Sequence, residues 1–199
     1  MTWSAFVSAI LGAVLTQVVT VGLAIRRERI ARSYLVAKIS IQLEAFASAC
    51  GDISADWGQP ATHESGEETW TPIFAQLPDV SFDREVVDWT VIPHGTLVDV
   101  LRLPVRASAS RRVVANAEEY DDDPHMHREV FHARQTEYGA LGLSALDLAD
   151  RLRSLIHISN ISAEALQLRT RILDALHYTE SKHGEWREAR RPGVRGPLD

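Results

Sequence analysis

The chain lacks the several cysteines of disulfide-rich domains and cysteine zinc sites, and it lacks the excess of basic residues that is typical of nucleic-acid-binding proteins. Cys50 is the single cysteine among 199 residues, which excludes an intrachain disulfide and a zinc site built from several cysteines. The chain has 21 Lys and Arg against 27 Asp and Glu, a formal net charge of −6. This balance argues against a general nucleic-acid-binding surface, so we predict no nucleic-acid partner.

Strand patterns and familiar catalytic motifs are also missing from the sequence. No stretch shows the apolar–polar alternation of a half-buried strand bounded by turn residues. There is no Walker phosphate loop, no G-x-G-x-x-G, no H-E-x-x-H and no G-x-S-x-G. A lone Cys50 without a histidine near it in sequence is typical of a small core residue. We therefore predict no catalytic residue and no cofactor.

The most distinctive feature of the sequence is a long uncharged stretch near the N-terminus. Residues 3–25, WSAFVSAILGAVLTQVVTVGLAI, contain 23 positions without a charge. As a helix they would measure about 35 Å, enough to cross a hydrocarbon core of ~30 Å. This predicts a single transmembrane anchor over residues 1–25, with the lipid bilayer as a partner. The alternatives are a cleaved signal peptide, which lacks the usual basic region in front, and a buried core helix.

The flanks of this stretch predict an orientation. Four arginines and one acid follow it: Arg26, Arg27, Glu28, Arg29 and Arg32. The positive-inside rule places such arginines in the cytoplasm. We therefore predict a single-pass protein of the cell membrane, with its N-terminus outside and its C-terminal domain cytoplasmic. Trp3 and the four arginines would lie at the two membrane interfaces.

Small side chains recur every four residues along the uncharged stretch. They are Ser8, Gly12, Thr16 and Thr20. Such a ridge lets two membrane helices approach closely, so it predicts a homo-oligomer formed through the transmembrane helix. The alternative is that small residues are simply common in membrane helices.

The rest of the chain is patterned for helices. Apolar residues recur at helical spacing within 26–50, 95–121, 124–155 and 162–176, and shorter helices are expected at 72–77 and 82–91. Residues 51–69 predict a loop, and Pro104 should kink or break its helix. The predicted fold is all-α: an N-terminal transmembrane helix continuing into a small cytoplasmic helical bundle of about four long helices plus short ones. The bundle spans 26–184, and a disordered polar tail spans 185–199.

The helical patterns also predict how the bundle packs. We expect the faces that contain Tyr34, Leu101, Leu148 and Leu173 to form one core. Gly139 and Gly142 lie inside the clearest apolar helix, where a missing side chain favours close approach of another helix. The short connection near 158–161 makes the last two long helices antiparallel neighbours.

Histidines and acids gather at the start of one helix, in the sequence DDDPHMHREVFH of residues 121–132. His125, Glu129 and His132 are spaced i, i+4, i+7 and therefore share a helical face. Imidazoles and a carboxylate in this arrangement can bind a transition metal. The alternative is an exposed, capped helix start with incidental histidines.

Two Glu-x-x-His pairs, Glu129/His132 and Glu180/His183, match the spacing that di-iron four-helix bundles use on two helices. In a hairpin that turns near residue 159, His132 lies 27 residues before the turn and His183 lies 24 after it. The pairs would be offset by about 5 Å or more at ~1.5 Å per residue. The second pair also lies among polar residues, which indicates a helix surface. We therefore expect the two pairs not to share a metal.

These observations predict a non-enzymatic, membrane-anchored interaction or adaptor module. Its helical surface would engage a protein partner or a second copy of the chain. The alternative is a small membrane-tethered metal-binding protein or enzyme that uses His125, Glu129 and His132.

Overall fold

The protein is described here by a computed structural model that covers all residues except 1–2, 63–67, 83–88, 123–125, 157–161 and 190–199. The side chains of 3–15 and of Val91 are also outside the description. The elements in chain order are α1 (Trp3–Ser54), β1 (Gln59–Thr62), β2 (Glu68–Thr71), the 3-10 helix η1 (Trp89–Val91), α2 (His94–Glu119), α3 (Arg128–Ser154) and α4 (Ala163–Ala189). Helices dominate this part of the chain, which confirms the predicted all-α class.

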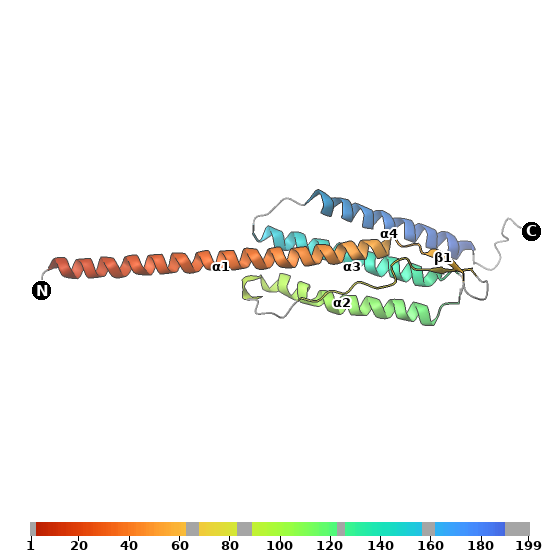
Figure 1. Cartoon of the computed structure of the whole chain (residues 1–199), viewed down its shortest axis with the longest axis horizontal. Coiled ribbons are helices and arrows are strands. Elements are labelled where there is room, and N and C mark those ends of the chain that lie inside the picture. Colours follow the sequence, from red (N-terminus) through yellow and green to blue (C-terminus); the bar gives the residue numbers. More distant parts are fainter. Residues whose placement is uncertain (1–2, 63–67, 83–88, 123–125, 157–161, 190–199) are drawn as a thin grey trace, which may run out of the picture.

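The four long helices are arranged around α3. This helix packs against α1, α2 and α4, and α1 also contacts α4. Figure 1 shows α2 and α4 on opposite sides of the α1–α3 pair, while the N-terminal half of α1 extends beyond the bundle. The uninterrupted α1 agrees with the expectation that the first helix continues to about Gly51.

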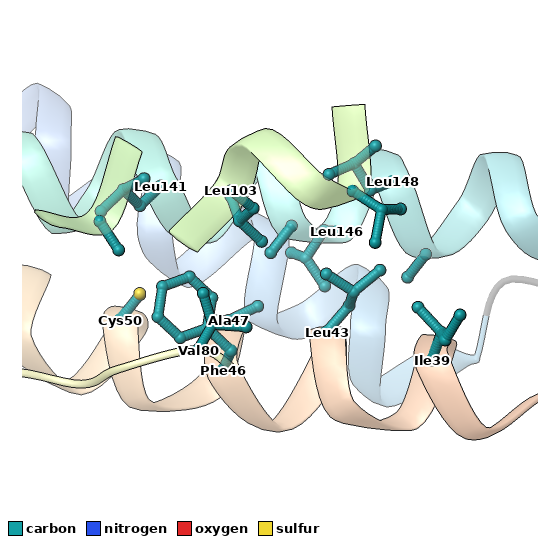
Figure 2. Packing of buried hydrophobic residues seen from close by; sticks show 14 of the residues in the cluster. Ile39, Leu43, Phe46, Ala47, Cys50, Val80, Leu103, Leu141, Leu146 and Leu148 are labelled. Atoms are coloured by element: carbon teal, nitrogen blue, oxygen red, sulfur yellow. The ribbon is translucent and has the colours of Figure 1, made fainter. Parts of the chain in front are cut away.

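The core lies between α1, α2 and α3 (Figure 2). α1 contributes residues at helical spacing: Val36, Ile39, Leu43, Ala47 and Cys50. Leu103 of α2 and Leu148 of α3 are buried against this row, at 0% and 3% exposure. Burying a leucine side chain fully contributes about 1.5–3 kcal/mol, so this contact between three helices stabilises the bundle.

The predicted core faces are only partly correct. Leu148 is buried, but Tyr34, Leu101 and Leu173 are 72%, 50% and 50% exposed. α2 instead buries the neighbouring row of Val100, Leu103, Ala107, Ser110 and Val114. Each of these helices carries apolar residues on more than one face, and the packing against α3 decides which face is covered.

The predicted close approach at Gly139 and Gly142 is confirmed. A Cβ atom on Gly139 would lie 2.6 Å from Cδ2 of Leu176, closer than non-bonded carbons can come. On Gly142 it would meet Cys50 and Ile172 at 3.0 Å. The two glycines therefore let α1 and α4 pack tightly on α3, and α3 and α4 are neighbours as predicted.

The predicted membrane anchor is corrected by the structure. In the part of the chain that the structure describes, no helix is long and apolar enough to cross a membrane. The predicted single-pass location and its orientation are therefore wrong. The interface roles of Trp3, Arg26, Arg27, Arg29 and Arg32 stay predictions.

The segment between α1 and α2 also differs from the prediction. β1 and β2 pair as an antiparallel hairpin in which Gln59 lies opposite Thr71, and residues 72–77 are not helical. The buried carboxylate of Asp56 accepts hydrogen bonds from the backbone N–H groups of Ile73 and Phe74 at 3.2 and 3.0 Å. These bonds hold the backbone in an extended path. Of the helix expected at 82–91, the described residues contain only η1.

Helix boundaries show two further differences. α2 continues through Pro104 without a break. α3 begins at Arg128, after His127 in a left-handed conformation with φ of 48°, whereas the predicted start at Asp123 and Pro124 lies outside the described residues. The side chain of Asp121 contacts His127 Nδ1 at 2.5 Å and fixes this turn.

Candidate metal centre

The first turns of α3 and the last turns of α4 bring two histidines together. The imidazole rings of His132 and His183 stack with centroids 3.7 Å apart and planes 20° apart. Glu129 lies one turn before His132 on α3, and its Oε2 is 3.9 Å from Nε2 of His183. The three side chains are partly buried, so they form one cluster between two helices.

This cluster has the donors of a transition-metal site. One ligand atom from each of Glu129, His132 and His183 can be chosen so that all three lie within 4.8 Å of one another. Imidazole nitrogen and carboxylate oxygen are common ligands of zinc and of other first-row divalent metals. Two ligand atoms of a tetrahedral zinc, each ~2.0–2.2 Å from the metal, lie about 3.3–3.6 Å apart, so the three side chains must draw closer together to bind one ion.

The structure brings together only part of the predicted ligand set. Glu129 and His132 share a face of α3 as expected, whereas His125 lies outside the described residues. His183 of α4 lies beside Glu129 and His132. The expected offset between the two Glu-x-x-His pairs is therefore wrong for His183. The pairing of Gly139 with Leu176 sets the register of the two helices. Continued along both helices, this register puts His132 directly beside His183.

The two glutamates are placed crosswise relative to the histidines. Glu129 of α3 lies beside His183 of α4, and Glu180 of α4 acts electrostatically on His132 of α3. Burial is the main cause that lowers the pKa of His132 from 6.5, and the nearby His183 and Arg187 lower it further. Glu129 and Glu180 partly offset these effects. The lowered pKa favours the neutral imidazole, which is the form that binds metal.

A buried polar network holds the two helices in this register. Thr179 donates a hydrogen bond to Oε1 of Gln135 at 3.1 Å, and Nε2 of Gln135 donates to the backbone oxygen of Asp56 at 2.7 Å. Arg134 donates to the backbone oxygen of Phe74 at 2.6 Å. Because these groups are buried, losing one partner would leave another unsatisfied at a cost of about 1–3 kcal/mol. The network ties the segments that follow α1 and β2 to α3, and Gln135 in turn links α3 to Thr179 of α4.

Gly58 allows the hairpin to approach this end of the bundle. Its φ is 75°, a conformation that side-chain-bearing residues rarely adopt. A Cβ atom there would lie 2.5 Å from Cζ of Phe131 and 2.9 Å from the backbone oxygen of Thr71. The absence of a side chain at Gly58 therefore lets Trp57 and β2 pack beside α3.

An aromatic pocket of about 620 Å³ adjoins the cluster, and His132 and His183 form part of its wall. The other aromatic residues of the wall are Trp57, Trp70, Phe131, Tyr178 and Trp186. Trp57 and Tyr178 meet edge to face with ring centroids 4.9 Å apart. Sequence reasoning missed this pocket because its residues come from four separate segments. The only local signal was the unusual pair of tryptophans at 57 and 70 in a stretch predicted as loop.

The remaining residues singled out from the sequence lie elsewhere. Cys50 is fully buried, and burial raises the pKa of its thiol, so it stays protonated and is a core residue as expected. Thr16 and Thr20 are exposed on α1, and Thr20 donates a hydrogen bond to the backbone oxygen of Thr16 at 2.8 Å. The side chains of Ser8 and Gly12 lie outside the described part, so the helix-association ridge stays a prediction.

Comparisons of the chain with protein-family models, with curated proteins and with solved structures found no match. The chemistry of the site is therefore inferred from its own residues. Two imidazoles, one facing carboxylate and a second carboxylate nearby can hold a divalent metal, and the aromatic pocket can hold a small organic molecule beside it.

Proposed function

We propose that this protein binds a divalent transition-metal ion between α3 and α4, with His132, His183 and Glu129 as ligands. The observation that carries the proposal is the placement of three donor atoms from two helices within 4.8 Å of one another. Zinc is the reference metal, because it accepts two imidazoles and a carboxylate in tetrahedral geometry.

The surroundings of the cluster support an open site. Three protein ligands leave the fourth tetrahedral position to water or to another molecule, the pattern of zinc sites that act on a ligand. Both histidines line the aromatic pocket, so that position is directed toward space that a small molecule can fill. Glu180 of α4 adds a second negative charge that acts on His132, and the positive charge of Arg187 on the same helix acts in the opposite sense.

The test is a calorimetric zinc titration of the full chain after treatment with a chelator. We expect one zinc per chain, and a loss of affinity by at least about 100-fold in His132→Ala and His183→Ala, since even groups outside the ligand set change affinity ~10–100-fold. His177→Ala is the matched control, because His177 is an exposed histidine of the same helix and is not part of the cluster. Zinc binding that is unchanged in both ligand variants contradicts the proposal.

The interaction module predicted from the sequence is a second candidate function. Every described side chain of α1 from Thr16 to Ala31 is exposed, and this part of the helix lies beyond the bundle (Figure 1). Val18, Val21 and Ile25 are 63%, 56% and 46% exposed. Their spacing of three and four residues puts them on one stripe, the pattern by which two helices pair. The proposed occupant is therefore a second copy of α1.

A further inference from the structure

We infer that the aromatic pocket beside the metal cluster binds an aromatic carboxylate, with its ring between the aromatic side chains and its carboxylate toward the histidines. This inference rests on the proposed metal site and names the class of molecule that would bind there. The pocket of about 620 Å³ is within the usual size range of small-molecule sites, ~300–1,000 Å³.

The aromatic walls of the pocket favour a ligand with a flat, apolar ring system. Its aromatic walls come from different elements: Trp57 follows α1, Trp70 is on β2, and Tyr178 and Trp186 are on α4. Aromatic rings attract one another in edge-to-face or offset stacked pairs. Trp57 and Tyr178 already meet edge to face, at 83° between their planes, so the wall of the pocket presents aromatic surface in two orientations to a planar guest.

The charges around the pocket favour an anion. Its charged lining residues are Arg128, Lys182 and Glu185. Lys182 and Glu185 form an ion pair at 2.8 Å, which leaves Arg128 as the excess charge, and a divalent metal held with the carboxylate of Glu129 would add one net positive charge. The guanidinium of Arg128 lies 5.7 Å above the ring of Trp186, and the ammonium of Lys182 lies 5.8 Å above the ring of Tyr178. These ring faces already have cationic partners from the protein, which argues against a cationic ligand.

The position of the histidines sets the orientation of the ligand. His132 and His183 form part of the pocket wall, and a metal held by them has an open position facing the pocket. A carboxylate is a common oxygen ligand of zinc. The ligand class that satisfies all three features therefore carries a carboxylate directly attached to, or close to, an aromatic ring system.

The experiment compares three probes of nearly equal size on the zinc-loaded full chain by calorimetry: 2-naphthoate, 2-naphthylmethanol and 2-naphthylmethylammonium. We expect 2-naphthoate to bind at least about tenfold more tightly than the alcohol, the factor that one charge-assisted contact supplies. The ammonium probe should bind most weakly. Tyr178→Ala should weaken naphthoate binding, whereas Tyr34→Ala, which removes an exposed tyrosine of α1, should not.

The outcomes separate this inference from the metal proposal. Zinc binding without a preference for naphthoate overturns the inference and leaves the metal site standing. Failure to bind zinc overturns the metal proposal, and the same probes are then compared on the metal-free chain with Arg128→Gln. A naphthoate preference that disappears in that variant supports an anion-selective pocket, and equal binding of the three probes overturns it.

Discussion

His132 and His183 are 51 positions apart in the sequence, yet their rings stack at 3.7 Å where α3 and α4 run side by side. This ring contact depends on packing and hydrogen bonding at other positions along the two helices. Gly139 lets Leu176 of α4 approach α3, and the hydrogen bond between Thr179 and Gln135 fixes the register of the two helices.

The stacked pair predicts an unusual titration of His132 in the metal-free protein. Its pKa should lie below 6.5, because burial and the neighbouring His183 both disfavour the protonated ring. His183→Ala removes one of these causes and opens the site to water, so the pKa of His132 should rise toward 6.5. Histidine ring shifts followed by NMR against pH measure this directly. A pKa that does not move in His183→Ala would contradict the described contact.

The same shift predicts how stability depends on pH. In the unfolded chain His132 takes up a proton near its ordinary pKa of 6.5, whereas in the folded chain it does so only at lower pH. The unfolded state therefore binds more protons in this window, and the free energy of unfolding decreases as the pH falls below about 6.5. His132→Gln should lose less stability than the unmodified chain between pH 7 and pH 5, as measured by urea denaturation. Parallel pH profiles would show that His132 is not responsible.

The core predicts a clear difference between two leucines. Leu148 is 3% exposed and Leu173 is 50% exposed. Leu148→Ala should lower the free energy of unfolding by about 2–5 kcal/mol, the range for a fully buried leucine. Leu173→Ala should cost much less. Equal losses in chemical denaturation would mean that the core is not where the structure places it.

Gly139 predicts the effect of one added methyl group. The Cβ atom of Gly139→Ala would collide with Leu176 at 2.6 Å, so we expect a loss of about 1–3 kcal/mol from overpacking and weaker zinc binding. Gly184→Ala is the control on α4, since a Cβ there has no neighbour within 4 Å. It should be neutral or stabilising by up to ~1 kcal/mol. A stable Gly139→Ala with normal zinc affinity would contradict the tight α3–α4 contact.

The exposed stripe of α1 predicts self-association. Sedimentation equilibrium of the full chain should show a dimer that dissociates on dilution, and Val18→Asp combined with Val21→Asp should give a monomer. Ile30→Asp is the control, because Ile30 is 61% exposed on the same helix but lies about 120° around it from Val18 at ~100° per residue. A monomer at all concentrations of the unmodified chain removes the second candidate function.

Much of the fold was predictable because helical periodicity is a local property. The all-α class, the continuous first helix, the apolar face of α3 and the close approach at Gly139 were all read from spacing and residue size. The buried faces of α1 and α2 were not, because Tyr34 and Leu101 belong to apolar rows that compete with others on the same helix. Which row is covered depends on tertiary packing. On α4 the predicted stripe was largely correct, since Ala165 and Ile172 are buried while Leu173 is exposed. The hairpin was missed because Asp56 and Gly58 shape it through contacts that are distant in sequence.

The metal cluster was only half predictable for a related reason. Glu129 and His132 share a helical face by spacing alone. The contribution of His183 depends on the register between α3 and α4. With a turn placed at residue 159, the sequence predicted that His132 and His183 would be offset by three residues, an offset that the packed helices do not have. The buried Thr179, expected at the surface, makes the hydrogen bond that helps to set this register.

The most direct test of the proposed metal site is an NMR titration of the full chain with zinc, observing the ring nitrogens of all eight histidines. The account predicts that the signals of His132 and His183 shift together and stop changing at one equivalent of zinc. The signal of the exposed His177 should stay in place. Zinc that shifts other histidines while leaving His132 and His183 unchanged, or that shifts only one of the two, would contradict a metal held between α3 and α4.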